Sequence, residues 1–79
     1  MTTIVTLYEV TCHFSWEDEN ETSTWTCASL EGANKLVERE KNHELVWYSI
    51  AGYTYHPCNE DDPNGQLYKG MIYHEFKEL

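Results

Sequence analysis

The chain has 79 residues and a formal net charge of −9, from fourteen acidic and five basic side chains. This length fits one domain over residues 1–79, and the 41% hydrophobic content favours a folded globule over a disordered segment. An acidic surface repels phosphate, which disfavours direct nucleic-acid binding and favours basic proteins as partners, including proteins that hold nucleic acid. The same charge also fits a plain role in solubility.

The cysteine pattern predicts a reducing compartment. Cys12, Cys27 and Cys58 are odd in number and lack the close spacing of a disulfide framework. The sequence also shows neither a secretory signal nor a run of about 18 apolar residues that could span a membrane. We therefore expect a soluble protein of the cytoplasm (the host-cell cytoplasm if the protein is viral), with free thiols and no membrane partner.

The first two predicted strands form a hairpin with an acidic tip. In residues 4–16 apolar side chains alternate with polar ones, which is the period of a strand with one buried face. Residues 17–21 hold four acids in five positions and predict a solvated loop. A second strand follows over residues 22–28, with Trp25 and Cys27 on one side and threonines on the other.

One amphipathic helix is predicted next. Ser29 suits the N-cap position, and Glu31 lies in the first turn, where a carboxylate complements the helix dipole. Apolar residues then recur at helical spacing as far as about residue 42. This apolar stripe consists of Leu30, Ala33, Leu36 and Val37.

The third and fourth predicted strands, residues 44–56 and 67–77, form a long second hairpin. The loop of residues 57–66 between them contains Asp62–Gly65, whose proline in second place and glycine in fourth fit a type I turn. Gly52 inside the third strand indicates either a bulge or a close approach of another group to the backbone.

These elements predict an α+β domain with the order β-β-α-β-β, in which one helix packs on one face of a four-stranded antiparallel sheet. Short connections favour the strand order 2-1-3-4, although other orders also satisfy them. A single helix covers only one face of such a sheet, so the second face is expected to stay open unless another chain covers it.

The second hairpin carries more apolar and aromatic side chains than the helix can cover. Trp47, Tyr53 and Tyr55 alternate with Val46, Tyr48 and Ile50, and Tyr68, Ile72 and Phe76 alternate with Leu67, Met71 and Tyr73. Only one set in each strand can face the helix, and the uncertainty at Gly52 leaves open which one. Exposed Tyr and Trp are typical of protein interfaces. The candidate interface anchors are Trp47, Tyr53, Tyr55, Tyr68 and Tyr73.

Acidic loops are expected to assist binding. The candidate residues are Glu17, Asp18 and Glu19 in the first hairpin and Glu60, Asp61 and Asp62 in the second. The 2-1-3-4 order places the two loops at opposite ends of the sheet, which spreads the charge and argues against mimicry of a phosphate line. The sheet aromatics could also stack RNA bases, but only Lys69 and Lys77 supply positive charge on the last two strands.

The remaining residues predict neither an enzyme nor a cofactor. His56 and Cys58 form a possible half of a zinc site, but no second pair has suitable spacing. Cys27 lies near the helix start, yet the sequence supplies no base to activate it. Motifs for hydrolysis or phosphate binding are absent from the sequence. We expect no catalytic residue and no metal ligand, and rank a small zinc-binding domain last among the alternatives.

In length, acidity, aromatic content and a compact plan with one helix, the whole chain resembles small acidic inhibitor proteins of bacteriophages, of the anti-CRISPR and anti-restriction type. The resemblance has no diagnostic motif and carries over no residue role. It implies a stoichiometric inhibitor that occupies a host nuclease or another nucleic-acid-handling complex. The residues themselves predict a non-catalytic protein-binding module. The alternative is a small structural homodimer that hides its aromatic face and inhibits nothing.

Overall fold

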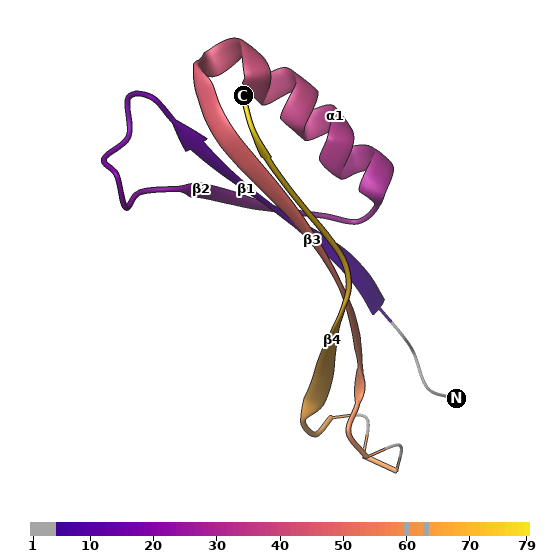
Figure 1. The fold of residues 1–79 in the computed structure, drawn as a ribbon. Coiled ribbons are helices and arrows are strands. Elements are labelled where there is room, and N and C mark those ends of the chain that lie inside the picture. The colour runs from indigo at the N-terminus through magenta and orange to yellow at the C-terminus, as the bar shows by residue number, and fades with distance from the viewer. Residues whose placement is uncertain (1–4, 60, 63) are drawn as a thin grey trace.

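The computed structural model describes residues 5–59, 61–62 and 64–79. Ile4 of the predicted first strand, Glu60 of the second acidic loop and Pro63 of the predicted turn lie outside these ranges. The elements are β1 (Val5–Phe14), β2 (Ser23–Cys27), α1 (Leu30–Glu40), a 3-10 turn η1 (Lys41–His43), β3 (Leu45–Pro57) and β4 (Leu67–Glu78). The predicted α+β class and β-β-α-β-β order are confirmed (Figure 1).

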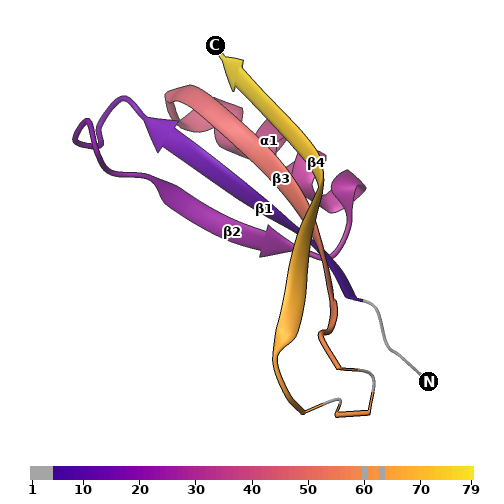
Figure 2. The ribbon, with the colours of Figure 1, turned by 60° about the horizontal axis from the view of Figure 1, so that its bottom comes forward.

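The four strands form one antiparallel sheet in the order β2-β1-β3-β4, the order that short connections favoured. Helix α1 lies on one side of this sheet and packs on β1, β2 and β3. Figure 2 shows the other side of the sheet, with α1 behind it and the hairpin of β3 and β4 reaching past the helix. The molecule is therefore elongated, with extents of 47 × 25 × 16 Å.

The core lies between α1 and the central strands. Every second residue of β1 is buried from Val10 to Phe14, as the alternation predicted, and β3 adds Tyr48 and Ile50. Helix α1 contributes Ala33 and Val37. The buried hydrophobic residues of the described chain are Val10, Cys12, Phe14, Ala33, Val37, Leu45, Tyr48 and Ile50. Burial of this apolar surface is the main stabilising term.

A bulge in β4 sets which side chains share a face. Gly52 pairs with Tyr73 but Tyr53 pairs with Met71, so Ile72 of β4 has no partner in β3. Strand β3 keeps its own alternation there, because its register with β1 continues without a shift past Gly52. The extra residue therefore lies opposite Gly52 rather than at it.

This bulge makes the sets predicted for the fourth strand wrong. The extra residue reverses the alternation in β4, because the residues before and after Ile72 pair with β3 in different registers. Phe76 consequently lies on the same face as Leu67 and Met71. Tyr73 lies on the same face as Tyr68.

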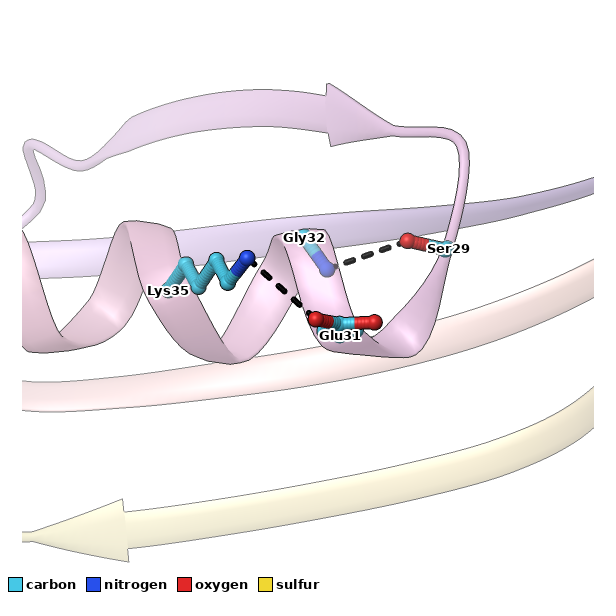
Figure 3. A network of polar contacts seen from close by, with 4 residues as sticks. All are labelled: Ser29, Glu31, Gly32 and Lys35. Atoms are coloured by element: carbon cyan, nitrogen blue, oxygen red, sulfur yellow. Dashed lines mark hydrogen bonds and ion pairs between the residues drawn. The ribbon is translucent and has the colours of Figure 1, made fainter.

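The first turn of α1 is held by the predicted N-cap. The Ser29 side chain accepts a hydrogen bond from the Gly32 N–H at 3.0 Å, and one turn further the Lys35 ammonium lies 3.2 Å from Glu31 (Figure 3). Both partners of this ion pair are more than three-quarters exposed, so water screens it.

We expect Ser29→Ala to lower the free energy of unfolding by about 1 kcal/mol, because the Gly32 N–H loses its acceptor. Lys35→Gln, the matched control on the same turn, should lower it by less than about 0.5 kcal/mol. Urea denaturation followed by circular dichroism measures both changes. Equal effects from the two substitutions would contradict the role of the cap.

Candidate protein-binding interface

The side of the sheet opposite α1 has no covering element among the described residues, and we call it the open face. Its members follow from the pairing registers, because residues paired across antiparallel strands point to the same side. In β1, and in β3 from Trp47 onward, these are the odd-numbered residues, since Val10, Cys12, Tyr48 and Ile50 face the core. The aromatic, charged and large apolar members are Val5, Leu7, Glu9, His13, Trp47, Tyr53, Tyr55, Leu67, Lys69, Met71, His74, Phe76 and Glu78.

One aromatic cluster occupies the end of the open face near the β1–β2 loop. The half-buried Trp47 ring lies between His13 and Phe76, with ring centroids 5.8 Å and 5.5 Å away. His13 is held in place because its Nδ1 donates to the Glu21 carbonyl at 2.7 Å. This hydrogen bond ties the acidic loop to the aromatic cluster.

A second cluster lies toward the tip of the β3–β4 hairpin. The Lys69 ammonium lies 4.0 Å from the centroid of the Tyr53 ring, 5.9 Å from that of Tyr55 and 3.7 Å from a carboxylate oxygen of Glu9. Desolvation lowers the pKa of Lys69, but Glu9 and the two tyrosines raise it by more, so the net pKa lies above its ordinary value. Both distances lie within the range of a cation–π interaction between the charged lysine and the tyrosine rings.

Large apolar side chains surround these clusters and reach solvent. Val5, Leu67, Met71 and Phe76 each expose between 44% and 58% of their surface. Single exposed apolar residues are ordinary on a protein surface, but four on one side of one sheet, beside ordered aromatic rings, have the composition of an interface.

Trp47, Tyr53 and Tyr55 lie on the open face. Tyr68 is also exposed, but it projects from the opposite face of the same hairpin, where its ring lies 4.8 Å from that of His56. These four predicted anchors are thus divided between the two sides of β3 and β4.

Tyr73 lies on the helix side of the sheet and is half-buried. Its ring packs edge-on against Tyr8 with the centroids 6.3 Å apart, and its hydroxyl donates to the Glu75 carboxylate at 2.9 Å. This hydrogen bond raises the pKa of Tyr73 above its ordinary value. These contacts hold Tyr73 within the domain, so it is not part of the candidate interface on the open face.

The predicted acidic residues have different roles in their loops. Glu17 is structural, because its carboxylate accepts from the Phe14 N–H at 2.9 Å and from the Ser23 hydroxyl at 3.3 Å. Asp18 and Glu19 of the same loop are exposed.

Asp61 and Asp62 are exposed in the β3–β4 loop, where the Gly65 N–H donates to the Asp62 carbonyl at 3.1 Å. This loop follows Pro57 at the far end of β3, whereas the β1–β2 loop lies beside the start of β3. The described acidic residues of the two loops therefore lie at opposite ends of the sheet, as predicted.

Sequence patterns alone missed Phe76, Lys69 and His13 as parts of this surface. Phe76 was not among the predicted anchors because Gly52 indicates a bulge in β3, whereas the extra residue, Ile72, lies in β4. The roles of Lys69 and His13 depend on pairing between strands distant in sequence. A hairpin register that allowed for a shift near Gly52 was the one signal that could have suggested Phe76.

Comparisons with protein-family models, curated proteins and solved structures find no match to this chain. No residue role therefore comes from a relative.

Within the described ranges, no group of three or more His, Cys, Asp or Glu side chains is placed so that it could hold a metal ion. His56 and Cys58 instead line a shallow hollow of about 310 Å³ with Pro57 and Tyr68. Nor does any helix in the described ranges have the length and apolar character needed to cross a membrane.

Cys12 and Cys58, two of the three free cysteines, should differ widely in reactivity. Cys12 is buried in the core, and its burial, with the nearby Glu40 and Glu17, raises the pKa of its thiol to about 11. Because the thiolate is the nucleophile, the raised pKa keeps Cys12 in its unreactive thiol form at pH 8. Cys58 is exposed.

We expect iodoacetamide at pH 8 to label Cys58 rapidly and Cys12 only after denaturation, as read by peptide mass spectrometry. Cys58→Ser is the control and should remove the rapidly labelled peptide that contains position 58. Rapid labelling of Cys12 in the native protein would contradict its position in the core.

Proposed function

We propose that the chain is a non-catalytic protein-binding module whose open face binds a basic protein. The observation that carries this proposal is the ordered aromatic surface of Trp47, Tyr53 and Tyr55, with apolar neighbours, on the side of the sheet that no described element covers. Buried Trp and Tyr provide much of the affinity in protein interfaces because they bring large area with little loss of conformational freedom.

Charge selects the class of partner. With fourteen acidic and five basic residues, the chain attracts positively charged surfaces and repels nucleic acid. The one lysine of the open face, Lys69, is already paired with Glu9 and stacked on Tyr53. Exposed acids such as Asp18, Glu19 and Asp61 flank the face at both ends, where they would meet the rim of a basic site.

A basic surface that accepts aromatic side chains is typical of proteins that handle nucleic acids. The likeness to small acidic phage inhibitors supports the same partner class and suggests inhibition by occupancy. We therefore propose a host nuclease or another nucleic-acid-handling complex as the target, bound at one copy per site. For a nuclease target, one equivalent of the chain should abolish cleavage.

Capture from extracts of the native cells tests this proposal with two matched variants. Met71→Asp and Tyr68→Asp add the same charge to similarly exposed positions of β4 on opposite faces. We expect the wild-type chain and Tyr68→Asp to retain a basic protein that about 0.5 M salt releases, and Met71→Asp to lose it. Retention of the same protein by Met71→Asp would exclude the open face as the binding surface.

The alternative is a homodimer that buries the open face against a second copy. Light scattering on the purified chain distinguishes the homodimer from the partner-binding module. If the open face forms the homodimer, Met71→Asp should lower a dimeric mass to a monomeric one.

A further inference from the structure

The free edge of β4 is the longest unpaired backbone in the sheet. Strand β4 has twelve residues and pairs only with β3, whereas the opposite edge strand, β2, has five. Long exposed edge strands present unpaired N–H and C=O groups to other chains, and proteins normally shorten, charge or cover them. This edge is therefore suited to pairing with another strand.

The hydrogen-bond alternation shows which residues present their backbone at the free edge. The Leu79 N–H donates to the Val46 carbonyl at 2.9 Å, so these two residues form a hydrogen-bonded pair of the β3–β4 ladder. Hydrogen-bonded and non-hydrogen-bonded pairs alternate along antiparallel strands. His74, Phe76 and Glu78 consequently direct their N–H and C=O groups away from β3.

The charges around Phe76 suit a second copy of the same segment. If two β4 strands run antiparallel with Phe76 opposite Phe76, Glu75 of each copy lies opposite Lys77 of the other, and His74 lies opposite Glu78. No ion pair within the described chain involves Lys77, so its charge is available to the second copy. This register lies entirely after the bulge at Ile72, where the strand is regular.

The neighbouring registers of a β4–β4 pair have less favourable charge pairing. Pairing centred on Glu75 or on Lys77 sets like charges directly opposite each other, which destabilises a strand pair. Pairing centred on Tyr73 sets Lys69 opposite Lys77 and places the bulge inside the contact. Pairing centred on His74 leaves every lysine and glutamate of this segment without an opposite charge.

We propose that two copies of the chain associate by antiparallel pairing of β4 with β4, centred on Phe76. The two-fold axis is then perpendicular to the sheet, so both open faces lie on the same side of an eight-stranded sheet and stay free. The net charge of −9 on each copy opposes association, so moderate salt should strengthen the dimer by screening this repulsion.

Charge reversal tests the edge and the register together, with sedimentation equilibrium as the measurement. Glu75→Lys and Lys77→Glu should each raise the dimer dissociation constant about tenfold or more, and the double variant should restore it to within about threefold. Glu31→Lys on the exposed side of α1 is the control for net charge and should not weaken the dimer. A dimer unaffected by both single reversals would overturn the proposal, as would a wild-type chain that stays monomeric at about 1 mM.

Amide hydrogen exchange gives a second readout on the unmodified chain. The N–H groups of His74, Phe76 and Glu78 should become protected as concentration rises, while those of Tyr73, Glu75 and Lys77 are already protected by β3. A dimer that leaves the Phe76 N–H unprotected would overturn the proposed edge.

Failure of the β4–β4 pairing proposal is distinguishable from failure of the proposed function. Met71→Asp should leave edge pairing unchanged while it abolishes capture of a basic partner, and Glu75→Lys should weaken edge pairing even if no partner is captured.

Discussion

Ile50→Ala is expected to lower the free energy of unfolding by about 3 kcal/mol, within the usual 2–5 kcal/mol for such a change. Ile50 is fully buried at the centre of the sheet and pairs with Val10 of β1 and Glu75 of β4. Truncation removes buried apolar area and leaves a cavity that the paired strands cannot fill. Domains this small hold only about 5 kcal/mol of stability, so the variant should be partly unfolded at 37 °C.

The control for Ile50→Ala is Ser49→Ala, the preceding residue on the open face. It should change stability by less than about 0.5 kcal/mol, since surface substitutions usually do. Urea denaturation with fluorescence and circular dichroism measures both. If Ile50→Ala proved the milder of the two, the assignment of faces in β3 would be reversed.

Gly52→Ala is expected to destabilise the domain by about 2 kcal/mol through overpacking. A Cβ at Gly52 would lie 2.7 Å from the nearest carbon of the Tyr8 ring and 3.1 Å from the Tyr73 Cβ. The backbone itself would accept alanine, because no described glycine has a positive φ, and alanine loses less entropy than glycine in a strand. The sign of the effect therefore depends on the contact with Tyr8.

A double-mutant cycle isolates that contact. In a Tyr8→Leu background the ring is gone, and Gly52→Ala should then lower stability by less than about 1 kcal/mol. Thermal denaturation of the four proteins gives the coupling. Additive effects would show that the Tyr8 ring is not what requires glycine at this position.

The sequence predicted the fold largely because its patterns are local. The alternation in β1, the cap at Ser29 and the glycine-containing turn after Asp62 each determine a nearby element, and short connections then favour one strand order. The faces of β3 and β4 could not be assigned in the same way. Both sides of β3 carry aromatic residues, so only its register with β1 decides that Tyr48 faces the core and Trp47 does not.

The candidate site was predicted in part for the same reason. Trp47, Tyr53 and Tyr55 share one side of one strand, so their grouping follows from alternation alone. Tyr73 and Phe76 exchange faces because of the bulge at Ile72, which has neither glycine nor proline to mark it. The ordering of Tyr53 by Lys69 and Glu9 depends on three strands meeting, which no local pattern encodes.

Binding through the open face is tested most directly by two tyrosines of the same hairpin. Tyr55 projects from the open face, and Tyr68 projects from the opposite face. With the captured basic protein purified, isothermal titration should give Tyr55→Ala a dissociation constant about thirtyfold or more above wild type, the usual loss for an interface anchor. Tyr68→Ala should stay within about twofold. The reverse order, or equal losses for the two variants, would contradict binding through the open face.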